Sequence, residues 1–175
     1  MTTWQIDPAH TSVEFGVKHM MISTVRGSFK NVSGRVTPAE RPSVEVTIPV
    51  QTIDTGVDKR DDHLRSADFF DVATHPEMTF TGTLVEGTIE KGGLLAGDLT
   101  IRGTTRPVTL EVESNGEMKD PWGNTKLGFA ATGTINRTEF GLTWNQLLEA
   151  GGIAVGEKVK LTIDVQLVKE AAVAA

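Results

Sequence analysis

The sequence predicts an all-β domain in which roughly eight or nine antiparallel strands close into a barrel. Apolar and polar residues alternate along most of the 175-residue chain, a pattern typical of strands with one buried and one solvated face. The last alternating row spans about eleven residues, twice the usual strand length, and such long strands favour a closed barrel over a sandwich. Turn-forming sequences separate the rows: Asp7-Pro8, Thr37-Pro38, Glu90–Gly93, Asn115-Gly116 and Gly151-Gly152.

The alternating rows follow one another along the chain, and each row predicts a strand. Side chains two residues apart point to the same face of a strand, so the apolar residues of a row mark the face toward the interior. In chain order the rows are Val13–Val17, Val44–Val50, Met78–Leu84, Leu99–Ile101, Val108–Val112, Leu127–Ile135 and Val159–Leu167.

The segment between Thr24 and Val36 changes parity. Its apolar and small residues fall into two rows, one with Val25, Gly27 and Phe29 and the other with Val32, Gly34 and Val36. A one-residue bulge reverses the inward and outward faces beyond it. The sequence alone therefore does not decide which row of this segment faces inward.

Residues 54–76 interrupt the alternation with a crowd of charges and a Phe-Phe pair. Thr55 and Asp58 have the spacing of a capping box, which predicts a short helix near residues 56–66, with Asp61 and Arg65 as an exposed i,i+4 pair. A helix this short is not stable alone, so we expect Leu64, Phe69 and Phe70 to dock onto one end of the barrel. A solvated connector would explain the charges but not the two phenylalanines.

Residues 136–152 form a second break in the pattern. Trp144, Leu147 and Leu148 fit a helical turn near residues 144–149 that ends at Gly151-Gly152. We expect residues 1–170 to form one domain and residues 171–175 to be a frayed tail.

Composition and motifs exclude several classes of function. The net charge of −6 argues against a nucleic-acid partner, and the absence of cysteine removes thiolate chemistry. The four histidines have no metal-ligand spacing, so we expect no metal, and no nucleotide-binding or Gly-x-Ser-x-Gly motif is present. No segment has the apolar length for membrane insertion, and the first ten residues show no signal-peptide pattern, so we expect a cytoplasmic location.

Small residues among the apolar rows predict a cavity inside the barrel. Gly82, Gly103, Ala131 and Gly133 would leave room for an apolar ligand, although such glycines can also relieve strand coiling around a solid interior. His19 ends the row of Val13–Val17, so it can meet a ligand head group at the barrel mouth, or it can bond a backbone carbonyl as a partly buried histidine.

Five segments together resemble the YceI-like family, in the family's order and over nearly the whole chain. They are WQIDPAHTSVEFGVKHMMISTVRGSF, DDHLRSADFFDVATHPEMTF, GDLTIRGTTRPVTL, NRTEFGL and VGEKVKLTIDVQL. The resemblance implies an extended, eight-stranded, lipocalin-like barrel whose pore takes a long-chain amphiphile. The family is described as polyisoprenoid-binding and is associated with dimers, so the resemblance implies a homodimer. Some relatives hold fatty-acid amides or sequester hydrophobic antibiotics, and many are periplasmic.

These observations together predict a non-enzymatic carrier or store for an isoprenoid-type lipid, without a cofactor. We expect Phe69, Phe70 and Trp144 to close a mouth, and the polar end of the ligand to meet His19, Arg137 or, less directly, Arg60 and His63. The expected wall of the pore is Val13, Phe15, Val17, Phe80, Leu84, Leu99, Ile101, Phe129, Ile135, Ile163 and Val165.

Two other functions use the same pore. A cyclase or isomerase would need an acid or base inside it, for which the sequence offers His19 and Glu139. A stress-response protein would sequester foreign hydrophobic molecules and would differ in its ligand alone.

Overall fold

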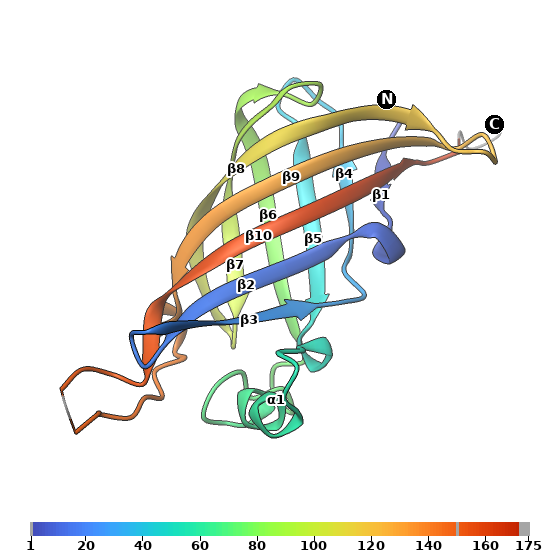
Figure 1. Cartoon of the computed structure of the whole chain (residues 1–175). Coiled ribbons are helices and arrows are strands. Elements are labelled where there is room, and N and C mark those ends of the chain that lie inside the picture. The colour runs from blue at the N-terminus through green and yellow to red at the C-terminus, as the bar shows by residue number, and fades with distance from the viewer. Residues whose placement is uncertain (1, 150, 172–175) are drawn as a thin grey trace.

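The computed structural model describes residues 2–149 and 151–171 and shows an antiparallel β-barrel with one short helix at its end (Figure 1). Apart from Ala171, the predicted tail at residues 171–175 lies outside the described residues. The strands are β1 (Trp4–Ile6), β2 (Ser12–His19), β3 (Ser23–Phe29), β4 (Ser33–Thr37), β5 (Ser43–Pro49), β6 (Glu77–Thr88), β7 (Gly92–Ile101), β8 (Thr104–Lys119), β9 (Thr125–Asn136) and β10 (Val155–Lys169). The helices are α1 (Asp58–Arg65) and the 3₁₀ turns η1 (Pro8–His10), η2 (Val50–Thr52) and η3 (Arg137–Phe140).

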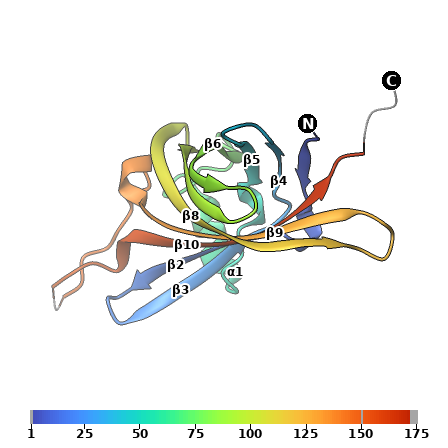
Figure 2. The same ribbon diagram turned by 90° about the horizontal axis from the view of Figure 1, so that it is seen from above.

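The barrel closes because β1 pairs with both β4 and β10. The hydrogen-bonded order β1-β4-β5-β6-β7-β8-β9-β10 therefore returns to its start as a ring of eight. Two further strands extend this ring: β2 pairs with β10, as β1 does, and β3 pairs with β2. The pair β1 and β2 thus forms one long wall strand with a single interruption, and the pair β3 and β4 forms another (Figures 1 and 2). The predicted eight-stranded barrel is confirmed.

The change of parity between residues 24 and 36 is real. β3 ends at Phe29, the chain adopts a left-handed conformation at Asn31 (φ 56°), and β4 begins at Ser33. This break reverses which parity of the chain faces the interior. Phe29 and Val32, which belong to rows of opposite parity, are therefore both buried.

Helix α1 fills a gap in the wall at one end of the barrel. The outer edge of β3 is joined to the segment after β5 through paired backbone hydrogen bonds between Ser28 and Asp54, both 2.9 Å long. Leu64, Phe69 and Phe70 then pack on the core, as the sequence predicts. Figure 1 shows α1 below the open ends of β3 and β5. None of the helices in the described residues is long and apolar enough to cross a membrane.

The predicted capping of α1 is wrong, although the helix itself is confirmed. Val57 is the N-cap and makes no side-chain hydrogen bond. Thr55 instead donates its backbone N–H and its hydroxyl to the carboxylate of Asp61, which is only 4% exposed. Since Asp61 is turned inward in this way, Arg65 pairs with Asp62 at 3.1 Å and not with Asp61.

The helical turn expected at residues 144–149 is also wrong for the described residues of that range. A turn forms earlier, at η3, where the Asn136 side chain accepts the Thr138 N–H at 2.9 Å. Residues 142–148 contain no helical turn, and Leu147 forms an isolated bridge with Ile153. The Trp144 carbonyl, which a helix would use internally, accepts a hydrogen bond from Arg137 at 3.0 Å.

Candidate functional site

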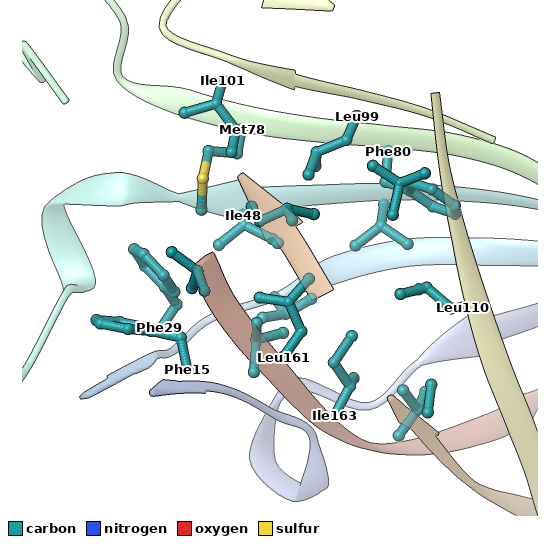
Figure 3. Close-up of a pocket in the computed structure, with 18 of the residues that line it drawn as sticks. Phe15, Phe29, Ile48, Met78, Phe80, Leu99, Ile101, Leu110, Leu161 and Ile163 are labelled. Atoms are coloured by element: carbon teal, nitrogen blue, oxygen red, sulfur yellow. The ribbon is translucent and has the colours of Figure 1, made fainter. Parts of the chain in front are cut away.

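An apolar cavity of about 460 Å³ runs through the interior of the barrel. This volume lies within the range of small-molecule sites. Its wall reaches from His19, Arg60 and Trp144 at the α1 end to Ile89 and Gly92 at the opposite end. Figure 3 shows side chains of separate strands pointing into this common space: Phe15, Phe29, Ile48, Met78, Phe80, Leu99, Ile101, Leu110, Leu161 and Ile163.

Every residue that the sequence singled out for the wall, the mouth or the polar end lies on this cavity. The reason is the alternation itself, because one parity of each strand must face the closed interior. Their placement on the wall is now an observation, whereas their contact with a ligand stays a prediction.

Several wall residues were not named in advance. Ile48, Leu110 and Leu161 share the parity of the predicted rows, so the same signal could have identified them. Phe29 and Val32 depend on the break at Asn31: the sequence shows the change of parity there but not that both rows face inward.

The glycines do not create the room that the sequence argument assigned to them. A Cβ at Gly82 would lie 2.7 Å from the ring of Phe80, and a Cβ at Gly133 would lie 2.5 Å from the side chain of Leu110. The neighbouring side chains already occupy these spaces, so the glycines let large residues lie flat against the wall. Gly103 lies in the β7–β8 turn with φ 74° and belongs to no inward row.

Three rings gather at the α1 end of the cavity. The His63 ring lies 5.1 Å from Phe69 and 4.7 Å from Trp144, both in edge-to-face geometry, and Phe69 lies 5.4 Å from Trp144. The Nε2 atom of His63 lies 2.9 Å from the carboxylate of Asp68. These contacts join the α1 segment to the loop after β9 at this end of the cavity, whereas closure of the mouth by these rings stays a prediction.

Arg137 ties the loop after β9 to the start of β10. Its side chain is buried, and its guanidinium donates to the carbonyls of Leu142 (2.6 Å), Trp144 (3.0 Å), Val155 (3.1 Å) and Gly156 (2.7 Å). Burial lowers the pKa of Arg137, and the negative charge of Glu157 opposes that shift. With four of its five N–H groups bound to the backbone, Arg137 shapes the mouth more than it offers donors to a ligand.

The two acid-base candidates from the sequence lie apart. His19 lines the cavity, whereas Glu139 lies in a separate depression formed with Asn136, Phe140 and Lys158. Within residues 2–149 and 151–171, no group of three or more His, Cys, Asp or Glu side chains is placed to hold a metal ion.

A closed antiparallel barrel around one elongated apolar cavity, with polar groups at a mouth, defines a lipocalin-like protein. The chain belongs to the YceI-like family, whose domain matches residues 4–167.

Relatives support the same assignment. The chain is 40% identical over 166 residues to a UPF0312 protein of Staphylococcus aureus, covering 91% of this chain and 94% of the relative. A UPF0312 protein of Staphylococcus epidermidis is 39% identical over the same length and coverage.

Solved structures share the fold. A Campylobacter jejuni YceI protein is 30% identical with a TM-score of 0.73, covering 88% of this chain and 90% of that one. A domain from Saccharophagus degradans, described as polyisoprenoid-binding, is 13% identical with a TM-score of 0.74, covering 95% and 98%. At that identity, the second likeness shows the fold alone.

Proposed function

We propose that the protein binds and carries a long-chain isoprenoid-type amphiphile, with the chain inside the barrel and the head at the α1 end. The observation that carries the proposal is the elongated cavity, whose wall is mostly apolar and whose ionisable residues lie near α1. The family assignment and the fold shared with a domain described as polyisoprenoid-binding support this ligand class.

The physical basis is the burial of hydrocarbon. Each methylene moved from water into an apolar site contributes about 0.8 kcal/mol, so a long chain can be held without many polar contacts. A rigid wall of strands also loses little conformational entropy when the ligand enters. No covalent step is needed, so we propose binding without catalysis. The cytoplasmic location and the homodimer stay predictions.

The first test is mass spectrometry of gently purified protein and of its organic extract. We expect a long-chain isoprenoid in the extract and a matching mass increase in the intact protein. Protein that is empty and also takes up no long-chain isoprenoid would contradict the proposal.

The second test uses two neighbouring alanines of β9. Ala131 is buried on the cavity wall, whereas Ala130 does not line the cavity. We expect Ala131→Phe to obstruct the cavity and lower ligand affinity at least tenfold, and Ala130→Phe to change it less than about twofold. Titration with a fluorescent long-chain ligand measures both. Equal loss in the two variants would show that the ligand does not occupy the barrel interior.

A further inference from the structure

All ionisable residues on the cavity wall are basic, and all lie at one end. They are Lys18, His19, Arg60, His63 and Arg137, and no Asp or Glu of the described residues lines the cavity. This bias opposes the composition of the chain, which has 23 acidic residues and 17 lysines and arginines. The far end of the wall, around Pro42, Thr88 and Ile89, has no ionisable group.

Acidic residues near this end do not face the cavity, and Glu157, which acts electrostatically on Arg137, lies outside its wall. Asp61 is buried and accepts both hydrogen bonds from Thr55. Asp68 lies against His63 at 2.9 Å. None of these carboxylates lines the cavity, so the charge that a ligand meets at the α1 end is positive.

Arg60 is the best-placed free donor at this end. Its Nε and one Nη donate to the hydroxyl and carbonyl of Thr55 at 2.7 and 2.8 Å, which fixes the guanidinium. Its three other N–H groups have no hydrogen-bond partner in the part of the chain that the structure describes. Lys18 touches the mouth of the cavity, but it alternates with the inward-facing Val17 and His19 along β2, so its exposed side chain points away from the interior.

We infer that the α1 end of the cavity selects an amphiphile with an anionic head group, a carboxylate or a phosphate, bound by Arg60. A hydrogen bond between two charged groups is roughly twice as strong as one between neutral groups. A neutral head would leave the guanidinium beside apolar ligand without a counter-charge, which costs desolvation. The inference rests on the proposed function and adds the chemistry of the head group.

The test compares three ligands with the same isoprenoid chain: the alcohol, the carboxylate and the monophosphate. Titration calorimetry at pH 7.5 should give affinities at least about tenfold tighter for the two anionic ligands than for the alcohol. Equal affinity for all three would overturn the head-group inference and leave the carrier function standing. Failure of all three to bind would overturn the carrier function.

Variants locate the effect. We expect Arg60→Gln to weaken the anionic ligands about tenfold and the alcohol much less. Arg106→Gln, an exposed arginine of β8 outside the cavity, is the matched control and should change none of the affinities. An equal loss for all three ligands in Arg60→Gln would overturn the inference.

Inorganic phosphate separates a head-group site from a free-phosphate site. Without a chain it lacks the burial that holds the ligand, so we expect it not to displace the prenyl monophosphate at millimolar concentration. Displacement at that concentration would show a phosphate site independent of the cavity and would overturn the inference.

Discussion

The two ends of the barrel are built by different means. At the α1 end, irregular segments replace strands, and buried polar side chains hold them: Asp61 binds the turn before α1, and Arg137 binds the loop after β9. At the far end, strands continue into hairpins, and the β8–β9 hairpin extends beyond the barrel, with Trp122 at its tip 83% exposed (Figure 2). The comparison teaches that backbone hydrogen bonds between strands are enough to hold the barrel wall together. The irregular segments of the mouth instead require hydrogen bonds from specific side chains.

The far end has a polar cluster of its own, but it lies on the rim. Asp7 accepts hydrogen bonds from His10, from the Ala9 backbone and from Lys126. This cluster secures the 3₁₀ turn between β1 and β2, where the wall strand is interrupted. Charged side chains that bind backbone groups therefore shape the mouth of the cavity at the α1 end, and at the far end they stabilise the interruption between β1 and β2.

The largest effect should come from Arg137. Arg137→Met keeps the length of the side chain but removes four hydrogen bonds to backbone carbonyls, and we expect a loss of about 3–5 kcal/mol in the free energy of unfolding. Urea denaturation measures it. Arg35→Met, at an exposed arginine of β4 without side-chain hydrogen bonds in the described residues, is the control and should change stability by less than about 0.5 kcal/mol. Similar losses in both variants would remove the distinction between the ends.

A smaller loss of stability should distinguish substitution of Asp61 from substitution of its neighbour Asp62. Asp61→Asn weakens two hydrogen bonds to a buried carboxylate, and we expect a loss of about 1–3 kcal/mol in the free energy of unfolding. Asp62 is exposed and pairs only with Arg65, so Asp62→Asn should lose about 0.5 kcal/mol or less. Parallel thermal and urea unfolding compares the two. If Asp62→Asn is as damaging as Asp61→Asn, then α1 is held by its surface charges.

The smallest effect concerns Asp7 and depends on pH. Burial raises the pKa of Asp7, but hydrogen bonds from His10, Lys126 and Ala9 outweigh it and hold that pKa below its ordinary value of 3.8. A lowered pKa in the folded state means that the ionised carboxylate stabilises the fold above about pH 4, and that this contribution is lost as the pH falls through the folded-state pKa.

We therefore expect Asp7→Asn to cost about 1 kcal/mol or less at pH 7. The difference in unfolding free energy between the two proteins should narrow as the pH falls below 3.8, and it should be smallest below the lowered pKa of folded Asp7, where this residue is neutral in the unmodified protein too. Denaturation curves at pH 7, 4 and 3 follow this difference. A difference that widens on acidification would show that the pKa of Asp7 is raised.

The errors of the sequence reading share one cause. The capping box at Thr55 and the helical turn at residues 144–149 were inferred from local spacing, and in both places a side chain from elsewhere along the segment captured the backbone groups. The prediction that inward glycines leave room for a ligand failed for the same reason, because Phe80 and Leu110 fill the space beside Gly82 and Gly133. Local patterns do not include the side chains that fold onto them.

The sequence by itself determined the barrel and its inner face. Alternation with a period of two depends only on the geometry of an extended backbone, so each row could be assigned without knowing its neighbours. The sequence also placed Phe69, Phe70 and Trp144 at a mouth, but the tertiary structure alone decided which contacts build it. His63 and Trp144 are far apart in the chain, and only the fold brings their rings to 4.7 Å from each other at the α1 end. Long-range side-chain contacts have no period that a sequence could display, which is why the wall was predictable and the contacts of the mouth were not.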